Sequence, residues 1–189
     1  MTATPVQRFA LAARTATFGR TFGDPVLLVA AARLRRTMRL EAGASPKIVD
    51  AMDAPLPDGP LVDARPDVDR LVADARRVAD AEKQLIDDLI REIDSAWPKK
   101  PQPIASWSGT IAPGQAARFR IAAGGEIAIA GDGRAPVVLS AMIGGQMMRD
   151  ERALRSCAYM IQDWGTDDAI VDIGNLGRSA SAIVVAWHD

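Results

Sequence analysis

The chain has 189 residues, of which 48% are hydrophobic and 25% are charged. This balance is typical of a folded globular protein and excludes a disordered or collagen-like chain. The 23 basic and 24 acidic side chains nearly cancel, so the formal net charge is -1. Because nucleic-acid binding depends on an excess of basic side chains that neutralise phosphates, the balance argues against nucleic acid as a partner of the whole chain.

The cysteine content argues against disulfides and thiolate metal sites, and the short apolar runs argue against an export signal and a membrane span. Cys157 is the only cysteine, so neither an internal disulfide nor a thiolate zinc cluster is expected. Arg8, Arg14 and Arg20 interrupt the first apolar segments, which argues against an export signal there. The longest apolar run, residues 26–32, is far shorter than the roughly 20 residues that cross a bilayer. We therefore expect no membrane span.

Local signals in the first half of the chain predict helices. Asp24-Pro25 is a typical helix start, and the apolar-rich residues 26–40 then lead to Gly43, a residue typical of helix ends. This pattern predicts a helix over residues 26–40. Ser45-Pro46 repeats the start signal for a short segment, residues 47–52.

The pattern then changes to a loop followed by a long amphipathic segment. Residues 54–65 are rich in proline and aspartate, which predicts a loop. Over residues 66–93, apolar residues recur at steps of three and four, which places them on one helix face. This spacing predicts one helix of about 30 residues, roughly 45 Å long. Its apolar face is a candidate surface for self-association or for a protein partner.

Charge is unevenly divided along this half. Residues 1–40 contain seven arginines and one acidic residue, whereas residues 50–97 contain 13 acidic and six basic residues. The opposed signs favour antiparallel packing of the first helices on the long one, although each exposed ion pair contributes only about 0–1 kcal/mol. The functional alternative is an anion-binding strip made of Arg33, Arg35, Arg36 and Arg39.

A proline-rich connector marks the predicted domain boundary. Three prolines between residues 97 and 103 oppose helix and favour an extended chain, which gives a helical domain over residues 1–97 and a second domain over residues 104–189. In the second domain, apolar residues alternate and glycine-containing turns recur. The predicted strands are residues 105–111, 116–121, 126–130, 137–142, 156–163, 169–173 and 182–187.

This alternation of short strands and turns is typical of an antiparallel β-sandwich or jelly roll. The predicted fold class is therefore α+β, with an N-terminal α-helical bundle followed by a C-terminal antiparallel, jelly-roll-like β-sandwich.

Several segments of the second half carry a family resemblance. They are Gly114-Gln115 before Phe119-Arg120-Ile121, residues 136–140, Cys157-Ala158-Tyr159-Met160 and residues 171–177, the last similar to a V-x-N-x-G turn before a final strand. Over about residues 104–188 the chain resembles the bacterial pre-peptidase C-terminal domain family. The resemblance implies a small β-sandwich attached to secreted or periplasmic proteins, with a cytoplasmic location as the alternative.

The chain also departs from that family in two ways. Residues 131–135 replace its acidic, Asp-rich strand opening, and Cys157 has no partner. Both departures argue against a calcium site and a stabilising disulfide.

Reactive side chains are sparse. His188 is the only histidine and lies next to the C-terminus, which disfavours Ser-His, Cys-His and multi-His sites. The acidic group Asp163, Asp167, Asp168 and Asp172 lacks the spacing of a calcium loop and is typical of a solvated turn. Glycine-rich residues 131–133 and 174–177 do not join a strand to a helix, as a phosphate cradle requires. We expect no catalytic residue, no metal site and no cofactor.

The main hypothesis is a non-catalytic binding or interaction protein in an exported or cell-envelope setting. Its protein partner, or a second copy of the chain, would contact the long helix. A carbohydrate-binding module is the first alternative, because flat indole rings stack on sugars when they share a face, and core packing is the competing role of these rings. A carboxylate-based hydrolase is the least favoured alternative. The candidate binding residues are Trp107, Trp164, Trp187, Arg33 and Arg36.

Overall fold

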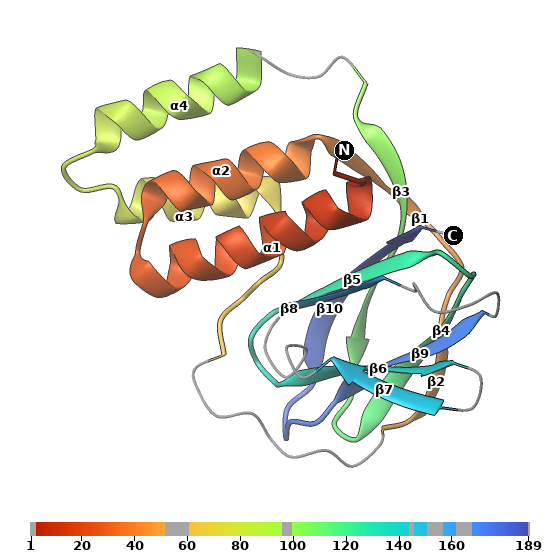
Figure 1. The fold of residues 1–189 in the computed structure, drawn as a ribbon. Helices are drawn as coiled ribbons and strands as arrows, with labels where there is room; N and C mark the ends of the chain where they lie inside the picture. The colour runs from red at the N-terminus through yellow and green to blue at the C-terminus, as the bar shows by residue number, and fades with distance from the viewer. Residues whose placement is uncertain are drawn as a thin grey trace.

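The computed structural model describes residues 3–51, 61–95, 100–143, 146–150, 157–161 and 168–188. Within these ranges the chain forms four helices and two five-stranded sheets (Figure 1), which confirms the α+β class. The helices are α1 (Pro5–Phe22), α2 (Pro25–Arg36), α3 (Val68–Val78) and α4 (Lys83–Ser95). None of these described helices is long and apolar enough to cross a membrane.

Short polar motifs set the helix starts. Thr4 and Gln7 form a capping box at the start of α1, each side chain bonding the backbone N–H of the other. Gly23 ends α1 in the left-handed conformation, with φ 64°. The Asp24 carboxylate then accepts the N–H groups of the first turn of α2. The Asp24-Pro25 start signal is therefore confirmed.

The predicted helix over residues 26–40 is wrong at its end. Helix α2 stops at Arg36, and the chain continues as strand β1 (Met38–Ala42). The Thr37 hydroxyl donates to the Leu34 carbonyl at 2.7 Å, which satisfies one of the last carbonyls of the helix. Met38 turns inward and is buried, so tertiary packing overrides the helix propensity of these residues. The short segment after Ser45-Pro46 is likewise a strand, β2 (Lys47–Asp50).

The predicted long helix over residues 66–93 is also wrong, because the chain breaks it in two. Helix α3 ends at Val78, with Ala79 as its C-cap, and α4 starts at Lys83. The break lets both segments place their apolar faces in one core with α2. Residues buried in this core are Leu28, Ala32, Leu71, Ala75, Ile86, Ile90 and Ile93. The face that suggested self-association is therefore largely covered within the chain.

The strands form two sheets, with order β1-β3-β10-β5-β8 in sheet A and β2-β4-β9-β6-β7 in sheet B. β1 runs parallel to β3, and all other described pairs are antiparallel. The remaining strands are β3 (Gln102–Ile111), β4 (Gln115–Ile121), β5 (Glu126–Gly131), β6 (Val137–Ile143), β7 (Gln146–Asp150), β8 (Cys157–Ile161), β9 (Ala169–Asn175) and β10 (Ser181–His188).

Besides the core around α2, two further apolar cores hold the layers together. The largest contains inward side chains of both sheets, such as Ile129 of β5 and Ile173 of β9. A second core packs Val6 and Phe9 of α1 against the other face of sheet A, at Ala186. Figure 1 shows α1 lying between sheet A and the other helices.

The predicted helical domain over residues 1–97 also contains strands. The segment assigned to a helical domain, residues 1–97, supplies β1 to sheet A and β2 to sheet B. A purely helical first part is therefore wrong. Residues 96–99 of the connector itself lie outside the described residues.

Asn175, at the end of β9, ties the last turn to the sheets. Its side chain is fully buried, and its amide donates to the Ile111 and Ser179 carbonyls at 2.9 and 2.8 Å. Its carbonyl oxygen accepts the Gly177 N–H at 2.8 Å. Three backbone groups thus depend on one buried side chain.

We predict that Asn175→Ala lowers the free energy of unfolding by about 2–4 kcal/mol, because buried polar groups lose their partners. Urea denaturation monitored by circular dichroism would measure the change. Arg178→Ala, in the same turn but exposed, serves as the control and should stay within about 0.5 kcal/mol of the parent. Equal, small effects of both substitutions would contradict the assignment.

Candidate functional site

Two adjoining cavities lie where α2, β1 and the start of α3 meet. Their volumes are about 580 and 480 Å³, and Arg35, Leu40 and Asp67 line both. We call the combined hollow the Arg35 groove. Its first part is also lined by Arg36 and Arg39, and its second by Phe9, Arg65, Pro66, Arg70, Ser108 and Val184.

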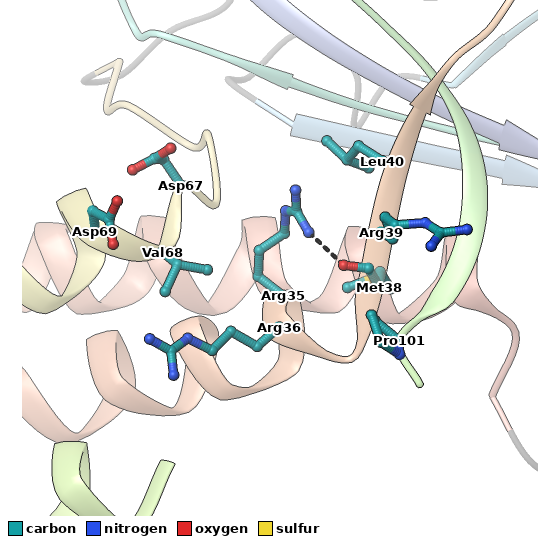
Figure 2. Close-up of a pocket in the computed structure, with 9 residues that line it drawn as sticks. All are labelled: Arg35, Arg36, Met38, Arg39, Leu40, Asp67, Val68, Asp69 and Pro101. Atoms are coloured by element: carbon teal, nitrogen blue, oxygen red, sulfur yellow. Dashed lines mark hydrogen bonds between the residues drawn. The ribbon is translucent and has the colours of Figure 1, made fainter. Parts of the chain in front are cut away.

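Arg35 is the central cation of the groove. Figure 2 shows its guanidinium between the start of α3 and strand β1, where Nη1 donates to the Met38 carbonyl at 2.9 Å. Burial lowers the pKa of Arg35, while the charge of Asp67 acts in the opposite direction. Among the described residues, no carboxylate lies within ion-pair distance of this guanidinium. The groove therefore contains a partly buried positive charge that a backbone carbonyl orients but does not neutralise.

The arginine strip predicted from the sequence does not form one surface. Arg36 and Arg39 line the first cavity, but their side chains extend in opposite directions in Figure 2. Arg39 forms an exposed ion pair with Glu41. Arg33 is exposed and is not among the residues that line the groove. Of the predicted strip, only Arg35 has a side chain that lines both cavities.

A buried carboxylate supports the second cavity. The Asp63 side chain is 10% exposed and pairs with Arg65 at 2.8 Å, with Arg70 at 2.7 Å and with Arg20 of α1 at 3.7 Å. Burial alone would raise the pKa of Asp63, but hydrogen bonds from Arg65 and the charges of Arg20 and Arg65 outweigh it and hold the pKa below its usual value. Asp63 therefore stays ionised and fixes both arginines of the groove wall.

Asp74 extends this cluster along α3. It accepts from Arg20 Nε at 2.8 Å and from Arg77 Nη2 at 2.8 Å. Here too burial would raise the pKa, and the two arginines lower it overall. The second cavity and this cluster together hold five arginines and three aspartates, an excess of two positive charges. The members are Arg20, Arg35, Arg65, Arg70 and Arg77, with Asp63, Asp67 and Asp74.

Sequence reasoning singled out neither Asp63 nor its partners Arg65 and Arg70. A local signal existed, because the Asp63 carboxylate also accepts the Arg65 N–H two residues later, a typical Asx turn. The pairing with Arg20, 43 residues earlier, had no such signal. It depends on how α1 lies against the segment before α3.

The tryptophans do not gather on one surface. Trp187 is 6% exposed within the core between the sheets, with its ring 5.4 Å from that of Phe119. Trp107 is half-buried and meets the same Phe119 edge-on at 6.0 Å. A Cβ built at Gly43 would lie 2.4 Å from Cζ2 of Trp187, so glycine backbone covers part of this indole. Trp187 therefore belongs to the core, and Trp164 lies outside the described residues.

The acidic group of the second half is paired where it is described. Asp172 binds Arg118 through two bonds of 2.7 Å, and Asp168 binds Arg120 at 2.7 Å. The hydrogen bond to Asp172 raises the pKa of Arg118. Asp163 and Asp167 lie outside the described residues. Within the described ranges, no group of three His, Cys, Asp or Glu side chains is arranged to hold a metal ion.

His188 is exposed at the end of β10, opposite Glu126 in the strand register. It does not line the Arg35 groove. The groove thus offers an excess of cations over the carboxylates of Asp67 and Asp69, together with apolar walls and a serine hydroxyl, a set suited to binding an anion.

No model of a known protein family matches this chain, and no curated protein matches it. Among solved structures, the chain is similar to a de novo designed double-stranded β-helix determined by NMR in solution. The match has a TM-score of 0.33 and 13% sequence identity, and it covers 44% of this chain and 97% of the designed one.

We predict that Asp63→Asn lowers the free energy of unfolding at pH 7 by about 3–5 kcal/mol, because it removes the buried charge that Arg20 faces. The pH dependence should change as well. A carboxyl group whose folded pKa is depressed stabilises the fold above its unfolded pKa of about 3.9, and the effect is lost as pH falls through the folded value.

Urea denaturation between pH 3 and pH 7 would therefore show a steeper acid loss for the parent than for Asp63→Asn. The control is Asp88→Asn, which breaks an exposed pair with Arg91 and should change stability by less than about 1 kcal/mol. Parallel pH curves for the parent and Asp63→Asn would refute the role of Asp63.

Proposed function

We propose that the chain is a non-catalytic binding protein that takes an anionic ligand in the Arg35 groove. The observation that carries the proposal is the partly buried Arg35 guanidinium, which faces two cavities with no carboxylate of the described residues within ion-pair distance. Taking a charge out of water is costly unless an opposite charge compensates it. A bound anion would supply that compensation.

The size and composition of the groove agree with a small ligand. Each cavity falls within the range of about 300–1,000 Å³ that is typical of small-molecule sites. Arg65 and Arg70 are held by Asp63, so the walls are fixed before a ligand arrives. A preformed site loses less conformational entropy on binding.

A second candidate is docking of a protein partner on α1. Leu11, Phe18 and Phe22 lie along one side of this helix and are 51%, 54% and 72% exposed, and the two phenylalanine rings stack at 6.1 Å. Helix α1 has no acidic residue, and Arg14 lies between Leu11 and Phe18 in the sequence, beside these exposed apolar side chains. Charge complementarity therefore favours an acidic amphipathic helix over a second copy of α1.

The proposal keeps two further expectations from the sequence. We propose that β3 to β10 form a jelly-roll-like β-sandwich, supported by two four-stranded sets with orders β3-β10-β5-β8 and β4-β9-β6-β7. We also propose that about residues 104–188 are related to the pre-peptidase C-terminal domain family, and that the protein therefore has a periplasmic or secreted setting. Their support is the alternation and turn pattern of the second half.

The groove is tested by comparing Arg35→Ala with Arg33→Ala. NMR titrations of the full chain with inorganic phosphate, citrate and hexanoate should show at least one anion bound by the parent. Loss of a charge-assisted contact should weaken that binding about 10- to 100-fold in Arg35→Ala. Arg33→Ala, which removes an exposed charge from the same helix, should bind as the parent does. Equal losses in both variants would indicate nonspecific attraction and contradict the proposal.

The α1 surface is tested with two synthetic helical peptides that share one apolar face, one bearing glutamates on the polar face and the other lysines. Fluorescence anisotropy should detect binding of the acidic peptide only. Phe18→Ser with Phe22→Ser should abolish it, whereas Leu85→Ser, an exposed apolar residue on α4, should not. Equal binding of both peptides would remove this candidate.

A further inference from the structure

The geometry points to a monocarboxylate with an apolar chain or ring as the ligand of the Arg35 groove. Its carboxylate would bind Arg35, and its apolar body would occupy the second cavity. This inference rests on the proposed function and narrows it to a chemical class.

The head group follows from how Arg35 is held. Its Nη1 donates to the Met38 carbonyl, which fixes the plane of the guanidinium between β1 and the start of α3 (Figure 2). Nε and Nη2 have no hydrogen-bond partner among the described residues. These two donors form one edge of a planar fork, and that edge matches the two oxygens of a carboxylate.

The other charges of the groove favour a single negative charge. Arg35, Arg65 and Arg70 line the second cavity, and the Asp63 and Asp67 carboxylates oppose them, so these five groups leave one net positive charge. The Asp67 carboxylate lines both cavities and acts electrostatically on Arg35. A dianion such as phosphate would exceed this single net positive charge and would also meet the Asp67 carboxylate. A monoanion suits the balance better.

The body of the ligand follows from the second cavity. Leu40 and Val184 are half-buried and present apolar surface to it, and Phe9 and Pro66 are buried beside them. Among the described residues, Ser108 is the only uncharged polar side chain that lines this cavity. When a hydrocarbon displaces water from this apolar surface, the free energy of the system falls.

The experiment is an NMR titration of the full chain at pH 7 with acetate, butanoate, hexanoate and octanoate, and with inorganic phosphate for comparison. Affinity should rise with chain length by up to about fourfold for each added methylene, until the cavity is filled. Phosphate should bind more weakly than hexanoate. Arg35→Ala should weaken all four carboxylates.

A substitution in the apolar wall of the second cavity tests the contribution of the ligand's apolar part separately from that of its carboxylate. Leu40→Ser should reduce the gain from acetate to octanoate, while acetate binding stays close to that of the parent. Ile48→Ser, on the exposed face of β2, is the matched control and should leave the series unchanged. The series on the unmodified chain tests the inference even where Leu40→Ser destabilises the fold.

The experiment distinguishes failure of the monocarboxylate inference from failure of the proposed anion site. If phosphate binds through Arg35 at least as tightly as hexanoate, or if affinity does not depend on chain length, the inference is overturned while the proposed anion site stands. If Arg35→Ala changes the binding of no anion, both the inference and the proposed function fail.

Discussion

The buried carboxylate of Asp63 is the interaction on which the helical side of the molecule depends. It joins Arg20 of α1 to Arg65 and Arg70, which flank the start of α3. The next residue, Ala64, is buried and donates its N–H to the Gly131 carbonyl of β5 at 2.9 Å. One short segment is thus fastened to a helix on one side and to sheet A on the other. Because it leads directly into Asp67, the same fastening positions the wall of the Arg35 groove.

Burial and charge have different roles in the two halves of the structure. Between the sheets the described core is mostly apolar, and Asn175, one of the buried polar residues, has its side-chain donors and acceptor satisfied. At the junction of helices and sheet A, by contrast, arginines and aspartates are partly buried together. Arg35 is partly buried in this junction but forms no ion pair with a described carboxylate. The cost of removing its charge from water is therefore not offset, which distinguishes it from the paired arginines around it.

The sequence predicted features that depend on neighbouring residues. The start of α2 follows from Asp24-Pro25, and all seven predicted strands from residues 105 to 187 overlap observed ones because alternation and turn residues are local signals. The end of α2 was missed because residues 37–42 combine good helix formers with the alternation of a strand, and only burial of Met38 decides between them. The broken helix and the Asp63 cluster were missed for a related reason. Both depend on partners distant in sequence, such as α2 and Arg20, and no local pattern encodes those contacts.

The placement of β1 and β2 has a consequence for behaviour at high concentration. β1 lies at one edge of sheet A and β2 at one edge of sheet B, and they pair with residues 102–106 of β3 and 115–118 of β4. A bare strand edge offers unpaired backbone groups that recruit other chains into fibrils. Here short strands bearing Arg39, Glu41, Lys47 and Asp50 occupy those positions. At these two edges, the first fifty residues therefore oppose the addition of strands from neighbouring molecules.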